Sequence, residues 1–115
     1  MKRDMELCRL LLMKVEGDTT PDLSEYSEEQ ITYHTALLIE AKLVDGGVAR
    51  DSVGYPAAAH AIKLTWQNHE FLDAARNDTI WKKTVTKVKS AGASVTFPIL
   101  QEILTIFIKQ QMGVP

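Results

Sequence analysis

The sequence predicts a small α+β protein in which two helices, a β-ribbon and further helices follow one another. Apolar residues recur at helical spacing near the N-terminus and again after Ser27. A glycine pair at 46–47 is followed by a segment whose apolar and polar residues alternate, and an apolar helix pattern closes the chain. With 115 residues, the chain has room for one hydrophobic core.

The first predicted helix covers Asp4 to Val15, and Gly17 follows it as a stop signal. A polar connection then runs from residue 18 to residue 26, where Pro21 disfavours helix at Thr20. The second helix begins after Ser27, which can form a capping box with Gln30. Its apolar stripe is Ile31, His34, Leu37, Leu38, Ala41 and Val44.

A β-ribbon is predicted next, with one strand near residues 43–49 and its partner at 60–66. Asp45, Gly46 and Gly47 turn the chain out of the helix. A long tip containing Gly54, Tyr55 and a run of alanines is expected to join the strands. In the second strand, residues alternate with the period of two that a half-buried strand requires.

Three more helices are predicted after the ribbon. The first covers residues 66–76, and the next is capped by Asp78 or Thr79 and places Trp81 inward. We expect Trp66 to be a buried anchor as well. After a joint at residues 90–94, the last helix runs from about Thr96 to residue 111, with Pro98 in its first turn.

This order of elements resembles a winged helix-turn-helix domain. The helix after Ser27 ends in a leucine pair before the ribbon, and "IKLTWQNHEFL" is similar to the exit from a wing into a following helix. The resemblance implies a winged-helix-like domain over residues 1–90 and a C-terminal apolar helix over residues 91–115. It also implies DNA as a partner.

A closer resemblance covers nearly the whole chain. The blocks "MKRDMELCRLLLMKVE", "YHTALLIEAKLV" and "LTWQNHEFLDAARNDTIWKK" are similar to an uncharacterised family of small bacterial, phage and prophage proteins. Asn68 stands where that family tends to have glycine, so the turn into this helix is expected to differ slightly. The family resemblance implies no activity.

If DNA is the partner, the second helix would enter the major groove, and the ribbon would lie along the backbone or in the minor groove. The candidate DNA-contacting residues are Gln30, Thr32, Tyr33, Thr35, Lys42, Arg50, Ser52, Lys82, Lys83, Lys87 and Lys89. The charge distribution opposes this hypothesis, because residues 16–30 hold six acids and no base, and the net charge is −2. The alternative is a protein-interaction module that binds a host or phage protein without contacting DNA.

The last helix is apolar over more than half of its circumference. Such a wide stripe either covers the core of its own chain or pairs with a second copy, so the sequence also predicts a homodimer. The candidate dimerisation residues are Ile99, Leu100, Ile103, Leu104 and Phe107.

The chain carries none of the common catalytic or metal-binding motifs, so we expect neither an enzyme nor a cofactor or metal. His34 lies on an apolar stripe and is interpreted as a hydrogen-bonded core residue rather than a ligand or base. Cys8 is the only cysteine and is interpreted as a buried structural thiol. Without a signal peptide or a long apolar segment, the chain is predicted to be cytoplasmic, with no membrane contact.

Overall fold

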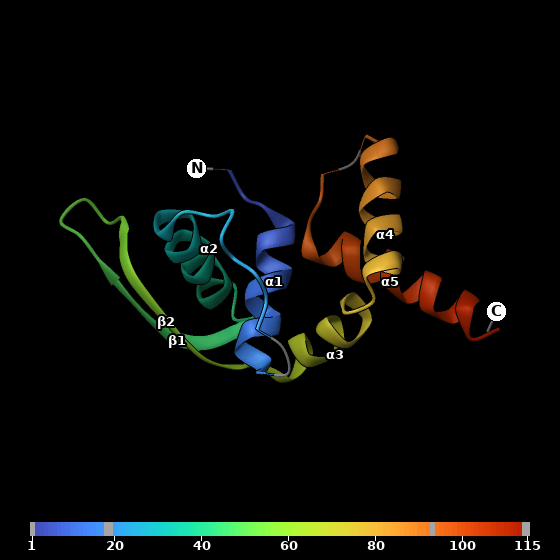
Figure 1. Ribbon diagram of the computed structural model, residues 1–115, viewed down its shortest axis with the longest axis horizontal. Coiled ribbons are helices and arrows are strands. Elements are labelled where there is room, and N and C mark those ends of the chain that lie inside the picture. The colour runs from blue at the N-terminus through green and yellow to red at the C-terminus, as the bar shows by residue number, and fades with distance from the viewer. Residues whose placement is uncertain (1, 18–19, 93, 114–115) are drawn as a thin grey trace. The chain divides into compact units, whose positions relative to one another are not determined.

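The computed structural model describes residues 2–17, 20–92 and 94–113, and it confirms a mixed α+β protein (Figure 1). Within these residues the chain forms five helices and one two-stranded antiparallel sheet. The elements are α1 (Met5–Glu16), α2 (Glu28–Glu40), β1 (Val44–Arg50), β2 (Pro56–Leu64), α3 (Trp66–Ala75), α4 (Asp78–Ser90) and α5 (Phe97–Gln111). Parts of the predicted connection at 18–26 and joint at 90–94 lie outside the described residues.

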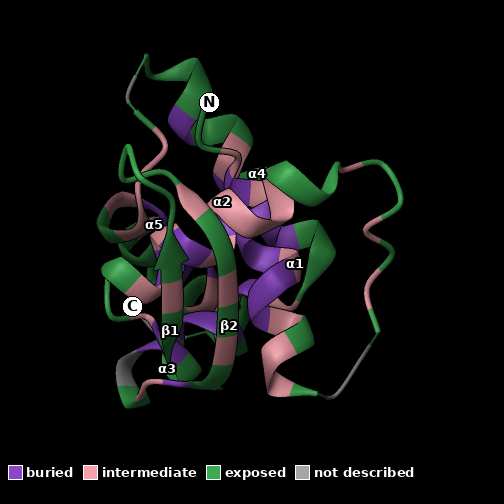
Figure 2. Ribbon diagram, turned by 90° about the vertical axis from the view of Figure 1, so that its left-hand side faces the viewer, coloured by how far each residue is buried: buried purple, intermediate pink, exposed green. Residues whose placement is uncertain are grey.

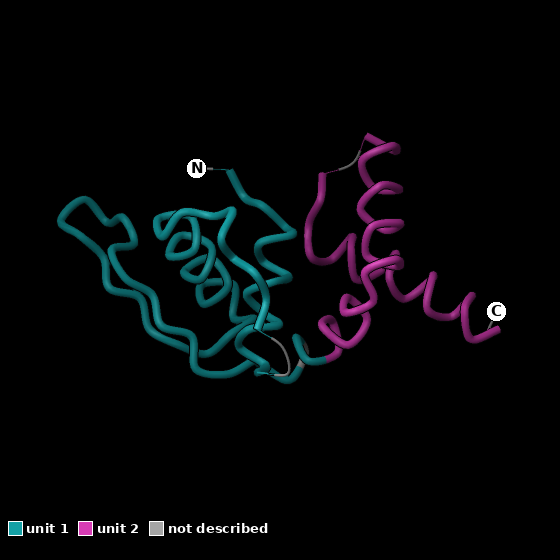
Figure 3. The backbone as a smooth tube through the Cα atoms, viewed as in Figure 1, with its two compact units in different colours: residues 1–69 teal, residues 70–115 magenta. Residues whose placement is uncertain are grey.

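The chain divides into two compact units, residues 1–69 and residues 70–115, which Figure 3 shows in different colours. Unit 1 contains α1, α2 and the β-ribbon, and unit 2 contains α4 and α5. The division falls inside α3, after His69, whereas the sequence placed a boundary between residues 90 and 91.

In unit 1, the two helices begin as predicted because each has its own cap. The Asp4 side chain accepts a hydrogen bond from the Leu7 N–H at 3.1 Å, and Ser27 and Gln30 form the expected capping box. The buried residues of α1 include Leu7, Cys8, Leu11 and Leu12, and α1 packs against α2.

His34 joins the two helices, which confirms its place in the core. It is 1% exposed, and its Nε2 accepts a hydrogen bond from the Asp4 backbone N–H at 2.8 Å. Its Nδ1 lies 2.8 Å from the Gln30 carbonyl oxygen. The two partners together assign a neutral ring with the proton on Nδ1.

The apolar stripe predicted that the second helix continues through Ala41 and Val44, but α2 ends at Glu40. The Leu43 N–H donates to the Leu38 carbonyl and the Lys42 N–H to the Ile39 carbonyl, which is the hydrogen-bond pattern of a Schellman motif. Lys42 takes the left-handed conformation that glycine usually fills there, with φ of 61°. Val44 is therefore the first residue of β1 and is buried.

The second strand begins at Pro56, four residues before the predicted start, so the prediction of a long alanine-containing tip was wrong. Arg50 pairs with Pro56, and the tip is residues 51–55. The Asp51 carboxylate closes this turn by accepting hydrogen bonds from the N–H groups of Val53 and Tyr55. Most ribbon residues are exposed or half-buried (Figure 2).

Trp66 is 79% exposed, so the prediction that it anchors the core was wrong. It is the first residue of α3, and the buried side of that helix is formed by Asn68, Phe71, Leu72 and Ala75. From Asn68 to Ala75 these residues recur at intervals of three or four positions and therefore share one face of the helix, whereas Trp66 does not lie on that face.

In unit 2, α4 packs against α5. Asn77 caps α4 by accepting from the Ile80 N–H at 3.0 Å, so neither Asp78 nor Thr79 is the cap. Trp81 is buried as predicted and meets Phe71 edge to face at 6.3 Å between ring centroids. In the described part of the chain, no helix combines the length and the apolar character needed to cross a bilayer.

Candidate functional site

The side chains of α2 that were expected to read DNA are already engaged within unit 1. Gln30 accepts the Ser27 N–H in the capping box, and Thr32 is half-buried. Tyr33 stacks on Tyr55 of the ribbon tip, with ring centroids 6.2 Å apart and planes 29° apart. Thr35 lines a cavity between α2 and the ribbon. The ribbon thus covers part of the face that would have to enter a major groove.

Of the three residues near the ribbon that were predicted to contact phosphate, one is paired within unit 1 and two are exposed. Arg50 forms an ion pair with Glu40 and donates a hydrogen bond to the Gly54 carbonyl at 3.0 Å, so its charge is compensated locally. Lys42 and Ser52 are exposed. Residues 1–69 hold seven Lys or Arg and eleven Asp or Glu, a formal net charge of −4, which repels phosphate.

The four lysines of α4 lie in the other unit, and all are exposed. Residues 70–115 hold six Lys or Arg and four Asp or Glu, a formal net charge of +2. The Lys83 ammonium lies 4.4 Å from the centroid of the Phe107 ring, a cation–π contact within unit 2. The lysines are Lys82, Lys83, Lys87 and Lys89.

The candidate dimerisation residues of α5 separate into two groups. Leu100, Leu104 and Phe107 are buried within the single chain, while Ile99 and Ile103 are half-buried. The more exposed apolar side chain of this helix is Ile106, at 45%. A homodimer through α5 stays a prediction, with fewer free apolar side chains than the sequence suggested.

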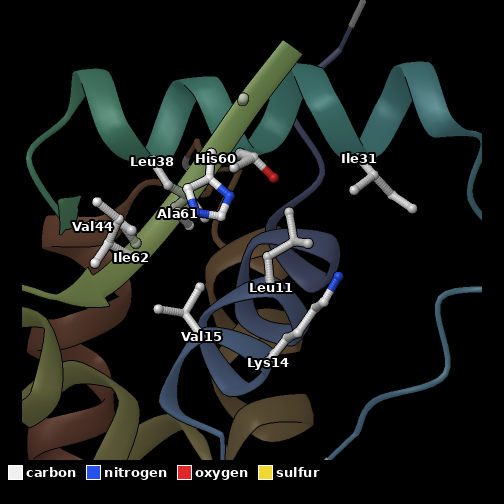
Figure 4. A pocket seen from close by; sticks show the side chains of 11 residues that line it. Leu11, Lys14, Val15, Ile31, Leu38, Val44, His60, Ala61 and Ile62 are labelled. Carbon is white, nitrogen blue, oxygen red and sulfur yellow. The ribbon is translucent and has the colours of Figure 1, made fainter. Parts of the chain in front are cut away.

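An open apolar cavity of about 340 Å³ lies in unit 1 between α1, α2 and β2, as Figure 4 shows. Helix α1 contributes Leu11 and Val15 to its wall, and α2 contributes Ile31 and Leu38. We call it the β2 groove, and the described residues that line it are Leu11, Lys14, Val15, Ile31, Thr35, Leu38, Val44, Ala59, His60, Ala61 and Ile62.

Four consecutive residues of β2, from Ala59 to Ile62, line this groove. Successive side chains of a strand point to opposite faces, so a run of consecutive residues is typical of a cavity that borders the edge of a strand. Helix α1, which forms the other wall, lies beside β2 on the side away from β1 (Figure 2). The β2 groove therefore follows the edge of β2 that does not pair with β1.

The direction of the backbone groups on this edge follows from Gly46. A Cβ at Gly46 would overlap the His60 carbonyl oxygen, so that carbonyl points toward β1. Backbone N–H and C=O groups of successive residues alternate in direction along a regularly paired strand, and the register is regular from Ala59 to Ala61, before the shift at Ile62. The groups of Ala59 and Ala61 therefore point the other way, toward the groove. Among the described residues, no hydrogen bond from outside the ribbon reaches these groups.

The polar side chains of the groove are Lys14, Thr35 and His60. Of the lining residues that the structure describes, Lys14 alone is charged, and both Lys14 and His60 are exposed. The side chains that line the groove are mostly apolar, but polar atoms form much of its accessible surface, a mixture that suits recognition of a peptide with both its backbone and its apolar side chains.

Elsewhere in unit 1, Cys8 and His69 belong to residue types that often react, but their surroundings are those of structural residues. Burial raises the pKa of the Cys8 thiol to about 12, with the nearby Asp4 carboxylate adding to the rise, so the thiol is protonated at neutral pH. His69 pairs with Glu16, with 3.1 Å between Nδ1 and Oε2. Across the described residues, no group of three His, Cys, Asp or Glu side chains could hold a metal ion.

Comparison with known proteins supplies the family. A model of the family described as hypothetical protein (DUF2513) matches residues 2–94 of the chain. The chain belongs to this family. The chain is also similar to an uncharacterized protein of Haemophilus influenzae, which is 31% identical over 120 aligned residues that cover 98% of this chain and 100% of the relative. No solved structure matches the chain.

The resemblance to an uncharacterised family is thus confirmed, and the DUF2513 description carries no activity. Sequence reasoning missed the β2 groove altogether. The signal that the sequence does carry is the group of alanines at 57, 58, 59 and 61, which places few bulky side chains along β2.

Proposed function

We propose that this chain is a protein-binding module built on a winged-helix-like core, and that it binds its partner through the β2 groove of unit 1. The observation that carries the proposal is an apolar groove beside a strand edge whose backbone groups have no partner among the described residues. Open strand edges and exposed apolar grooves are typical binding surfaces for other protein chains.

The charges of unit 1 support a protein partner over DNA. The unit has a net charge of −4, and Arg50 is paired with Glu40. Affinity for DNA depends largely on cationic contacts with phosphate, which this unit supplies poorly. Tyr33 stacks on Tyr55, so the helix expected to read bases would have to give up an internal contact first.

Site-specific photocrosslinking in the native cell tests this proposal. A photoreactive phenylalanine analogue in place of His60, inside the groove, should give a protein adduct of defined mass. The same analogue in place of Val53, which is 84% exposed at the ribbon tip and outside the groove, should not give that adduct. The proposal is wrong if the His60 position gives no adduct, gives only two copies of this chain, or crosslinks to nucleic acid.

DNA binding through unit 2 is the second candidate function, and the four exposed lysines of α4 favour it. Contacts from all four to phosphate would give a slope of log affinity against log salt of about −3.6 on duplex DNA. A mobility-shift titration measures that slope. Exchange of Lys82 and Lys83 for glutamate should abolish the shift, while Lys63→Glu in unit 1 should not. No shift at low salt would exclude this candidate.

A further inference from the structure

We propose that the partner occupies the β2 groove as an extended peptide segment, which pairs with the outer edge of β2 as a third strand and places an acidic side chain against Lys14. This inference rests on the proposed function and specifies what the groove binds. Its first support is geometric, because the outward N–H and C=O groups of Ala59 and Ala61 form the pattern that an added strand requires.

The size of the groove fits a short extended segment. The stretch from Ala59 to Ile62 spans about 13 Å at roughly 3.3 Å per residue, which corresponds to about four residues of a paired strand. Every second side chain of such a segment would point toward the apolar wall formed by Leu11, Val15 and Ile31. The intervening side chains would point to solvent. The segment should therefore alternate apolar and polar residues.

The charge of the groove selects an acidic residue in that segment. Among the described residues, Lys14 is the one charged side chain of the lining, and none of the lining residues described is an acid. A carboxylate of the partner beside Lys14 would form an ion pair at the rim of the groove. The net charge of −4 of unit 1 opposes a segment that is acidic throughout, so the segment should carry one acid at this position rather than several.

A second copy of this chain is a poorer occupant. The exposed strand edges that it would offer are the two edges of its own ribbon. At the centre of β1 stand Gly46 and Gly47, which have no side chain to place against the apolar wall. The other strand, β2, has the sequence PAAAHAIKL. That segment contains no Asp or Glu and would bring Lys63 toward Lys14 rather than a carboxylate. Like charges placed opposite each other across paired strands are destabilising.

Two proline variants distinguish binding by strand pairing from nonspecific binding. Proline removes the N–H of its residue and is tolerated on an edge strand where that N–H faces outward. Ala59→Pro removes an outward N–H on the groove side. Val48 lies directly opposite Ala59, so its N–H points out at the other edge of the ribbon, and Val48→Pro is the matched control. Circular dichroism shows whether each variant keeps its helices.

The probe is a phage-displayed library of random twelve-residue peptides, selected on the full chain. Enriched peptides should alternate apolar and polar residues and contain an Asp or Glu. Synthetic versions should bind Ala59→Pro about tenfold more weakly or worse, and Val48→Pro unchanged, since main-chain hydrogen bonds carry the affinity in strand addition. Lys14→Glu should weaken binding roughly fivefold, whereas Lys63→Glu, exposed on β2 outside the groove, should have little effect.

Several results would overturn the inference. These are an absence of enriched peptides, enriched peptides that bind Ala59→Pro and Val48→Pro equally, and selection of basic rather than acidic peptides. If Ala59→Pro does not fold, the pair Lys14→Glu and Lys63→Glu decides the matter, because both lysines are exposed. Crosslinking from position 60 without strand-type peptides would leave the groove as a protein-binding site and exclude only strand addition. Failure of both would reject the site itself.

Discussion

His34 offers a sharp test of how unit 1 is held together. Its Nε2 is the acceptor for the Asp4 backbone N–H at 2.8 Å, and Asp4 in turn caps α1. His34→Leu keeps a side chain of similar bulk but removes that acceptor. A partly buried donor left without a partner costs about 1–3 kcal/mol, so we expect a loss of about 2 kcal/mol in the free energy of unfolding.

Urea unfolding followed by circular dichroism measures this loss. With a denaturant dependence of about 1–2 kcal/mol per molar urea, the midpoint should fall by about 1–2 M. His34→Gln is the matched control, because its side-chain oxygen can occupy the position of Nε2 and accept from Asp4. Equal losses in the two variants would refute the reasoning, since they would show that packing rather than the hydrogen bond decides stability.

Three further predictions concern the backbone and the buried thiol. Gly46→Ala should lower the free energy of unfolding by about 1–3 kcal/mol in the urea assay, because the new Cβ would overlap the His60 carbonyl. Gly47→Ala is the control, because a Cβ there meets open space, and its free energy of unfolding should fall far less. Lys42→Gly should raise the free energy of unfolding by about 1 kcal/mol, because glycine adopts the φ of 61° without strain; an unchanged or lower midpoint would contradict the Schellman end of α2. Cys8 should resist iodoacetamide at pH 8 in the folded chain and react once urea unfolds it, because burial raises its pKa to about 12. Rapid alkylation of the folded chain at pH 8 would contradict the burial of this thiol. Because the folded pKa lies above the unfolded value of 9.0, the thiol stabilises the fold below pH 9 and loses that contribution as the pH rises toward 12.

The sequence predicted best those features that local chemistry decides. The caps at Asp4, Ser27 and Thr96 are short-range hydrogen bonds between near neighbours, and all three helices begin where the sequence placed them. The inward position predicted for Trp81 in α4 is likewise confirmed by its burial.

The features that the sequence did not predict are those in which a residue adopts a structure or an exposure that is uncommon for its type. Alanines have a weak preference for strands, so Ala57 and Ala58 did not indicate that β2 begins at Pro56. A lysine gives no sign of a left-handed helix end, which is why the stop at Lys42 was missed. Trp66 suggested burial by its size, but its place at the start of α3 leaves it exposed.

The candidate site was outside the reach of sequence reasoning for a different reason. Its wall combines residues of α1, α2 and β2 that are separated by up to about fifty positions, and none of them belongs to a chemical motif. The residues that the sequence did favour, Tyr33 and Arg50, are engaged with Tyr55 and Glu40 inside unit 1. Only the register of the ribbon shows that Ala59 and Ala61 face an open edge.

Amide hydrogen exchange along β2, measured by NMR with and without a selected peptide, tests the central claim most directly. In the free chain, the outward amides of Ala59 and Ala61 should exchange faster than the amide of His60, which faces β1. Saturating peptide should slow exchange at Ala59 and Ala61 by about tenfold or more and change His60 little. Binding that leaves both alanine amides in fast exchange would contradict the claim that the partner adds a strand to β2.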